Sequence, residues 1–136
     1  MKNKIQIIPN FSDLERFFPQ KKSEKRLERW NLKFELTIAY TGALGQVNGV
    51  EEMLDLAEMA RQQDKKWQFL IMGEGSHRQH LIESAKAKKL ENVHFVPFGP
   101  KEKVNELLSL ADFAWISFAH LPVLKTNSPN KFFDAL

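Results

Sequence analysis

From Phe34 to its end, the sequence repeats one unit: a short apolar run, a turn that holds Gly or Pro, and a stretch with helical spacing. This alternation is typical of a parallel sheet whose strands are joined by helices. The runs are apolar on both faces for most of their length, which predicts strands that are covered on both sides. The predicted fold is therefore α/β, a parallel sheet flanked by helices, with strands at residues 36–41, 68–72, 93–96 and 113–117.

Helical spacing fills the intervals between these strands. One stripe consists of Val50, Met53, Leu54, Ala57 and Ala60, and a second consists of Val104, Leu107, Leu108 and Ala111. A weaker helix is predicted over residues 76–89. The N-terminal part predicts a strand at residues 5–8, a short helix around residues 13–18 and a helix at residues 21–32. We expect one domain, with an opening strand and a basic helix in residues 1–33 and the βα repeats in residues 34–136.

The last ten residues start a helix that the sequence does not finish. Ser128 suits the N-cap position, and Pro129 suits the first turn. Phe132 and Phe133 begin an apolar face, yet no helix stop signal follows before Leu136. This pattern predicts that the chain is a fragment of a longer protein.

Composition restricts the classes of function. The chain has no cysteine, which excludes disulfides and thiol chemistry and fits a reducing cytoplasm. Of its four histidines, only His77 and His80 lie one helical turn apart, and we interpret that pair, which stands among polar residues, as a solvated face. We therefore expect no metal. No apolar run approaches the roughly 18 residues that a membrane-spanning helix needs.

The net charge of +3 comes entirely from residues 21–29. This stretch combines two glutamates with the basic residues Lys21, Lys22, Lys25, Arg26 and Arg29. A solvated basic helix face explains the pattern, and docking to anionic lipid headgroups is the functional alternative. Nucleic acid is not expected as a partner, because no basic groove with interleaved aromatic residues accompanies the charge.

Ligands of parallel α/β sheets lie beyond the carboxyl ends of the strands, so the loops at residues 41–49, 73–76, 97–101 and 118–131 are expected to line one crevice. In the first loop, Gly42, Gly45 and Gly49 let the backbone approach a phosphate at a helix N-terminus, although a plain structural turn explains them equally well. For the loop at residues 73–76, a structural turn is the favoured interpretation.

The closing helix carries two further candidates. Lys131 can neutralise a phosphate, and Asp134, about one turn later, can accept hydrogen bonds from a ribose diol. An ordinary Lys and Asp in a first helical turn would look the same.

Five motifs, spread over nearly the whole chain, resemble the C-terminal, nucleotide-sugar-binding half of the retaining family 4 (group 1) glycosyltransferases of GT-B fold. They stand in the order and at the separations of that family. The motifs are Ile8-Pro-Asn-Phe-Ser-Asp13, Tyr40-Thr-Gly-Ala-Leu-Gly-Gln-Val-Asn-Gly49, Phe69-Leu-Ile-Met-Gly-Glu-Gly75, Asn92-Val-His-Phe-Val-Pro-Phe-Gly99 and Leu110-Ala-Asp-Phe-Ala-Trp115. The closing Ser-Pro-x-Lys segment resembles the corresponding motif in the branch of bacterial enzymes that build cell-surface polysaccharides.

The resemblance implies a Rossmann-like parallel sheet flanked by helices, half of a GT-B fold and truncated here, without the N-terminal acceptor domain. It implies transfer of a sugar from a nucleoside diphosphate sugar, UDP- or GDP-linked, to an acceptor hydroxyl with retention, in polysaccharide or lipopolysaccharide biosynthesis. No cofactor and no metal are required. The partners would be the donor and, through the missing domain, an acceptor sugar or lipid-linked glycan. The enzyme would be cytoplasmic or peripheral at the inner membrane face.

The same resemblance assigns donor-binding residues but no catalytic residues, which in this family belong to the missing domain. It places Gly42 and Gly45 near the diphosphate, Lys131 on its charge and Asp134 on the ribose. The backbone from Val96 to Phe98 would lie against the base, although Phe98 fits a core position equally well.

Two departures from the family pattern stand out. Ala43 and Asn48 replace the usual Arg and Lys of the first loop, and Thr126 replaces the first of two spaced glutamates. Lys131 and helix N-termini would therefore carry the diphosphate charge.

Two other functions remain open at this point. One is a dinucleotide-dependent oxidoreductase domain with Glu74 as the ribose-binding carboxylate, although the usual Gly-x-Gly-x-x-Gly sequence is missing. The other is a non-enzymatic α/β binding or membrane-docking module that uses the basic residues 21–29.

Overall fold

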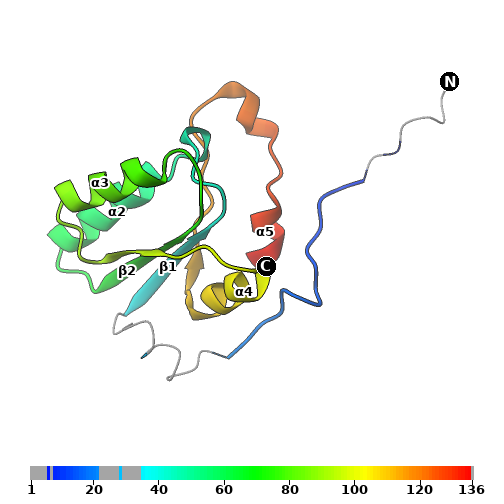
Figure 1. Ribbon diagram of the computed structural model, residues 1–136, viewed down its shortest axis with the longest axis horizontal. Helices are drawn as coiled ribbons and strands as arrows, with labels where there is room; N and C mark the ends of the chain where they lie inside the picture. Colours follow the sequence, from blue (N-terminus) through cyan, green and yellow to red (C-terminus); the bar gives the residue numbers. More distant parts are fainter. Residues whose placement is uncertain (1–5, 7, 22–27, 29–34, 136) are drawn as a thin grey trace.

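The computed structural model describes residues 6, 8–21, 28 and 35–135. Four parallel strands form one sheet in the order β3-β2-β1-β4, which confirms the predicted α/β class (Figure 1). The elements are β1 (Leu36–Thr41), η1 (Gln46–Asn48), α2 (Glu51–Gln62), β2 (Trp67–Met72), α3 (Arg78–Ala87), β3 (Val93–Val96), α4 (Lys101–Leu110), β4 (Phe113–Ala114), η2 (Pro122–Thr126) and α5 (Asn130–Ala135).

The register aligns the carboxyl ends of the three longer strands. Thr41 of β1 stands opposite Met72 of β2, and Met72 stands opposite Val96 of β3. The loops that follow these strands therefore leave from the same edge of the sheet. This carboxyl edge is where ligands of parallel α/β sheets bind.

The sheet separates two apolar layers, as the strand periodicity predicts. Along β1, Ile38 and Tyr40 face the layer with α2 and α3, whereas Ala39 faces the layer with α4. Strand β2 alternates in the same way, with Phe69 on one side and Leu70 on the other. Figure 1 shows α2 and α3 together on one side of the sheet and α4 on the other. The expected covering of both faces is confirmed.

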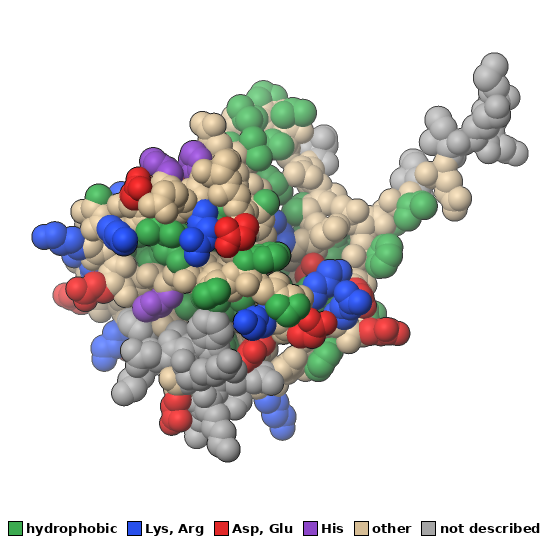
Figure 2. Space-filling model, viewed as in Figure 1, with side chains coloured by type: hydrophobic (Ala, Val, Ile, Leu, Met, Phe, Trp, Pro, Cys, Tyr) green, Lys and Arg blue, Asp and Glu red, His purple; other side chains and the backbone are tan. Residues whose placement is uncertain are grey.

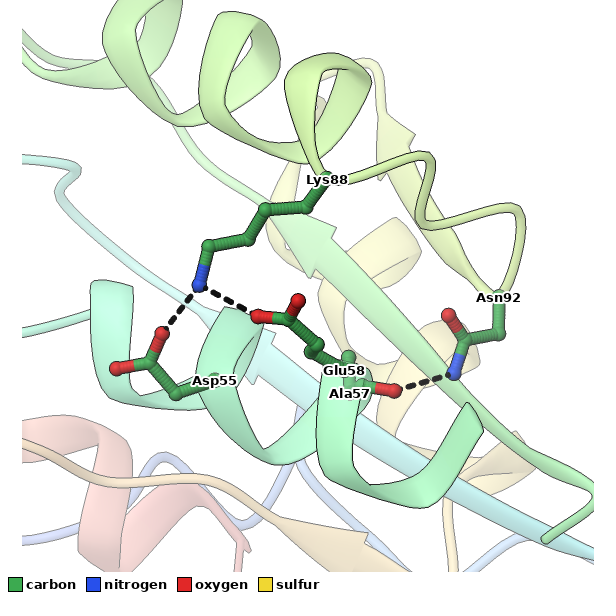
Figure 3. Close-up of polar contacts among 5 residues, drawn as sticks. All are labelled: Asp55, Ala57, Glu58, Lys88 and Asn92. Atoms are coloured by element: carbon green, nitrogen blue, oxygen red, sulfur yellow. Dashed lines mark hydrogen bonds and ion pairs between the residues drawn. The ribbon is translucent and has the colours of Figure 1, made fainter. Parts of the chain in front are cut away.

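Polar side chains that follow α3 form contacts with α2 (Figure 3). The Lys88 ammonium, just after α3, lies 2.6 Å from Asp55 Oδ1 and 2.9 Å from Glu58 Oε2, both on α2. These two hydrogen bonds raise the pKa of Lys88. The buried Asn92 side chain donates from Nδ2 to the Ala57 carbonyl oxygen at 3.1 Å and also to that of Trp67, at 3.3 Å. The first contact belongs to α2 and the second to β2, so Asn92 joins helix and sheet.

Several predicted boundaries change. Strand β4 ends at Ala114 rather than at Ser117, because only Phe113 and Ala114 pair with β1. The Ser117 hydroxyl donates instead to the Asn48 carbonyl oxygen at 2.7 Å. The expected helix at residues 13–18 is a turn in which the Arg16 and Phe17 amides both donate to the Asp13 carbonyl oxygen. Helix α5 begins at Asn130, one position after Pro129.

The remaining N-terminal predictions fall mainly outside the described residues. Of the strand expected at residues 5–8, Gln6 and Ile8 are described, and neither is in a strand. The basic helix at residues 21–32 lies outside the described residues apart from Lys21 and Glu28. Within the part of the chain that the structure describes, no helix has the length and apolar character to cross a membrane.

Candidate functional site

Two glycine-containing loops interlock at the carboxyl edge of the sheet. The Gly42 amide donates to the Met72 carbonyl oxygen at 3.0 Å, and the Leu44 amide donates to that of Glu74 at 2.8 Å. In return, the His77 amide donates to the Leu44 carbonyl oxygen at 2.9 Å. The loops of residues 42–49 and 73–77 therefore form one rigid backbone unit.

This close approach gives the second loop's glycines a structural reason. A Cβ atom at Gly73 would lie 1.9 Å from the carbonyl oxygen of Gly42, and one at Gly75 would lie 2.4 Å from that of Leu44. Both separations are far below van der Waals contact, so a side chain at either position would force the loops apart. These glycines need no ligand to explain them, as the interpretation of a structural turn expects.

Lys131 reaches from α5 to the end of β1. Its Nζ donates a hydrogen bond to the Tyr40 hydroxyl at 2.9 Å and lies 4.3 Å from the centre of the Tyr40 ring. The Phe118 ring centre is 5.6 Å from the same atom. A Cβ atom at Gly42 would lie 3.3 Å from Nζ. The structure thus brings together Gly42 and Lys131, as predicted, and adds two aromatic residues around the ammonium.

Burial controls the protonation of this pair. Desolvation lowers the pKa of Lys131 to about 8 and raises the pKa of Tyr40 to about 12. At neutral pH the lysine is charged and the phenol is neutral. The phenol then donates to the Ala43 carbonyl oxygen at 2.6 Å while it accepts from Lys131.

The Lys131 ammonium forms no ion pair with a carboxylate of the described residues. A partly buried cation without a counter-ion is stabilised by any anion that reaches it. Because Gly42 has no side chain, no further atom stands between its backbone and the ammonium. The chemistry of this corner therefore favours an anionic ligand.

Gly45 and the start of α2 fit an anion less directly. The Gly45 amide donates to Asn48 Oδ1 at 3.0 Å, so this donor is already used within its own loop. Glu51 and Glu52 occupy the first turn of α2, and their carboxylates already complement the positive end of the helix dipole. Of these groups, Lys131 is therefore the main one available to neutralise the charge of an anionic ligand.

Asp134 faces a different part of the surface. Its Oδ1 accepts a hydrogen bond from the Ser12 hydroxyl at 3.0 Å. The carboxylate borders a cavity of about 530 Å³ that Lys101 and residues 10–15 also line, and a second cavity of about 460 Å³. Lys131 lines neither of these two cavities. Lys131 and Asp134 thus project in different directions from α5.

The other predicted donor residues lie along the same edge in different environments. Val96 is buried in the α4 layer, so only its backbone is available to a ligand. Phe98 is 60% exposed, which excludes the alternative that it belongs to the core. Thr126 is the last residue of η2.

The predicted crevice forms in part. The Ala119 amide donates to the Val47 carbonyl oxygen at 2.9 Å, so the loop after β4 is joined to the interlocked pair of loops. The loop at residues 97–101 does not join them in the same way: its Lys101 lies beside the N-terminal residues 10–15 and Asp134.

Sequence reasoning missed three neighbours of the candidate residues: Tyr40, Phe118 and Ser12. Tyr40 was assigned to the predicted strand and to the first-loop motif but its side chain was given no role, although its place at the strand's carboxyl end was a usable signal. No signal in the sequence pairs Ser12 with Asp134, because the two lie near opposite ends of the chain.

Solved structures share this arrangement of strands and helices. The C-terminal domain of the glycosyl transferase group 1 family protein LpcC from Francisella tularensis superposes with a TM-score of 0.63, at 16% identity, over 76% of this chain and 56% of that one. HepE from Anabaena, solved in complex with UDP-glucose, gives a TM-score of 0.64, at 14% identity, over 83% of this chain and 32% of that one. The chain therefore has the Rossmann-like fold of the C-terminal half of GT-B glycosyltransferases.

The sequence has similar relatives. The putative colanic acid biosynthesis glycosyl transferase WcaI of Escherichia coli K12 is 27% identical over 110 residues. The match covers 77% of this chain and 26% of WcaI, so the chain spans about a quarter of that relative. The sequence profile of the family "Glycosyl transferases group 1" matches residues 21–118, which is more than half of the chain. The chain therefore belongs to the glycosyl transferases group 1 family.

Proposed function

We propose that this chain is the donor-binding part of a retaining glycosyltransferase that uses a nucleoside diphosphate sugar. The observation that carries the proposal is the ammonium of Lys131, partly buried beside Gly42 at the carboxyl edge and unpaired with any described carboxylate. Membership of the glycosyl transferases group 1 family supports a sugar-transfer reaction. HepE, a neighbour in fold, was solved with UDP-glucose, which makes a UDP-linked donor the first to test.

In this proposal Lys131 neutralises the diphosphate. Transfer of the sugar leaves additional negative charge on the departing diphosphate, and a fixed cation in a partly dehydrated site stabilises that charge in the transition state. Tyr40 holds the ammonium in place through its hydroxyl, and its ring contributes a cation–π contact. Gly42 leaves room for a phosphate oxygen next to Nζ. No metal is required for this step.

The remaining donor contacts follow the edge of the sheet. Asp134 binds the ribose hydroxyls, with Ser12 fixing its carboxylate through Oδ1. The backbone from Val96 to Phe98 lies against the base, Gly45 lies near the diphosphate, and Thr126 stands near the sugar. In this proposal the ribose approaches from the side of residues 10–15, where the two cavities border Asp134.

In this proposal the acceptor-binding site and the catalytic groups belong to the remainder of the protein. WcaI is named for colanic acid biosynthesis, which supports a role in surface polysaccharide or lipopolysaccharide assembly. In this proposal the basic residues 21–29 would hold the enzyme against the anionic cytoplasmic face of a membrane.

Isothermal titration with UDP, GDP and NAD tests the proposal. UDP or GDP should bind more tightly than NAD, and Lys131→Ala should weaken that binding at least about tenfold, in line with the roughly 1.5–3 kcal/mol of a charged hydrogen bond. Lys65→Ala is the matched control, because Lys65 is exposed and precedes β2 at the opposite edge of the sheet. Equal binding of all three nucleotides, or equal losses in the two variants, would refute the assignment.

A further inference from the structure

We propose that Glu51, His77 and His80 form a binding site for a divalent transition-metal cation such as Zn²⁺, at the point where the starts of α2 and α3 meet. One ligand atom from each residue lies within 4.8 Å of the other two. This proposal replaces the interpretation of His77 and His80 as a solvated face, which did not include Glu51.

Two helices supply the three side chains. Glu51 is the first residue of α2, His77 immediately precedes α3, and His80 lies in the first turn of α3. His77 Nε2 is already 2.8 Å from Glu51 Oε1, and the two imidazole rings lie 4.9 Å apart, centre to centre. Figure 2 shows histidine side chains gathered beside an acidic one on the surface over α2 and α3.

The spacing suits a small cation. Ligand atoms about 2.0–2.1 Å from a tetrahedral Zn²⁺ are roughly 3.4 Å from one another. The present separations of up to 4.8 Å are larger than this, so binding requires side-chain rotation, for which the exposed His80 is the least restricted of the three. Three protein ligands with one exposed member leave the fourth position to water.

The backbone fixes this frame before any metal binds. The His77 amide donates to the Leu44 carbonyl oxygen in the glycine loop, so His77 cannot move independently of that loop. Residue Glu51 follows the same loop at the start of α2. A bound cation would therefore cross-link the two interlocked loops on their outer side.

Charges of both signs surround a cation at this site. The positive ends of the α2 and α3 dipoles oppose it, by roughly 0.3–1 kcal/mol each at an exposed site. Arg78 is also close in sequence, but its side chain lies 3.5 Å from Glu74. Against these terms stand the Glu51 carboxylate in the site and that of Glu52 next to it in sequence. Imidazole and carboxylate ligands together select Zn²⁺, Ni²⁺ or Cu²⁺ rather than Mg²⁺ or Ca²⁺.

The chain offers a matched control for an ordinary Glu–His ion pair. Glu52, also in the first turn of α2, lies 3.2 Å from Nε2 of His120, and among the described residues this pair belongs to no three-ligand group. If the first cluster were only an ion pair, His80 would contribute no more to metal binding than His120. If His80 is a third ligand, substitution of His80 should weaken metal binding and substitution of His120 should not.

The test is isothermal titration of the 136-residue chain with ZnCl₂, compared among the wild type, His80→Gln, Glu51→Gln and His120→Gln. We expect one saturable site in the wild type, at least about tenfold weaker binding in the first two variants and unchanged binding in His120→Gln. Co²⁺ absorption spectra should show the same order. Circular dichroism checks that each variant is folded, and the exposed His80 makes its substitution the safest.

Thermal unfolding gives a second readout, because a ligand that binds the folded chain raises its melting temperature. Zn²⁺ should raise the melting temperature of the wild type and of His120→Gln but not that of His80→Gln. The absence of saturable binding in the wild type, or equal losses in His80→Gln and His120→Gln, would overturn the proposal.

Discussion

The ammonium of Lys131 donates a hydrogen bond to the Tyr40 hydroxyl and lies over the ring of the same tyrosine. This contact joins α5, near the end of the chain, to the central strand β1. It fixes a cation at the carboxyl edge of the sheet, where parallel α/β folds bind their ligands. The proposed donor site depends on this relationship.

Tyr40→Phe should keep the ring and remove the hydrogen bonds of the hydroxyl. Without the phenol oxygen, the Lys131 ammonium loses this hydrogen-bond acceptor and becomes less well positioned. We expect UDP affinity to fall about threefold to tenfold, with a stability loss of about 1 kcal/mol. Isothermal titration and urea unfolding measure the two effects. Unchanged affinity would show that Tyr40 does not position Lys131.

Stability should depend on pH through Lys131. Its pKa is about 8 in the folded chain and near 10.5 when unfolded, so between these values the unfolded chain binds more protons. The free energy of unfolding should therefore rise with pH across this window. Tyr40 acts in the opposite direction between its ordinary pKa of 10.0 and about 12, where the folded chain binds more protons.

Urea unfolding of the wild type and of Lys131→Met, measured at several pH values between about 8 and 10, isolates the lysine. The free energy of unfolding of the wild type, relative to that of Lys131→Met, should increase as pH rises. A difference that stays flat across this range would contradict the lowered pKa of Lys131.

Gly73→Ala should destabilise the interlocked loops. The new Cβ would overlap the Gly42 carbonyl oxygen, which belongs to backbone and cannot rotate away. We expect a loss of roughly 1–3 kcal/mol, as for other overpacking substitutions. Gly45→Ala is the control, because its Cβ would meet only the Asn48 side-chain oxygen, at 3.2 Å, and Gly45 already has a negative φ. Equal losses in thermal or urea unfolding would mean that the close approach of the loops is unimportant.

Asn92→Asp should cost more stability than Asn92→Ala. The Asn92 amide donates to two carbonyl oxygens, and a carboxylate in its place would face both of them without a proton to donate. We expect about 1–2 kcal/mol for the alanine variant and a larger loss for the aspartate variant. Acidification should restore part of the aspartate loss, because a protonated carboxyl can donate again. Urea unfolding at two pH values checks both statements, and an alanine variant that is the less stable at neutral pH would contradict them.

Much of the fold could be predicted from apolar periodicity. The bounds expected for β1 and β3 are those observed, and four residues of the first helical stripe, Met53, Leu54, Ala57 and Ala60, are buried on α2. Strand β4 and the turn after Asp13 were predicted less well. The extent of β4 depends on its pairing with β1, which covers only Phe113 and Ala114, and local sequence does not specify such a partner. The turn after Asp13 is closed by hydrogen bonds within residues 13–17 and does not continue as a helix.

The candidate site shows the same division. Because the strands were predicted to be parallel, the sequence could predict which edge of the sheet would carry Gly42 and Lys131, although it predicted neither the strand order nor the register. It could not predict that Ser12 would hold Asp134 while Tyr40 holds Lys131. Those pairings join residues from the two ends of the chain.

The sequence by itself determined the α/β class, the two buried layers and which loops follow the carboxyl ends of the strands, because burial and strand pairing leave a repeating pattern in neighbouring residues. Only the tertiary structure decided that Lys131 points at Tyr40 and Gly42, that Gly73 and Gly75 serve loop packing, and that Glu51 meets His77 and His80. Each of these contacts joins segments that are distant along the chain. Their geometry exists only after the helices have packed on the sheet.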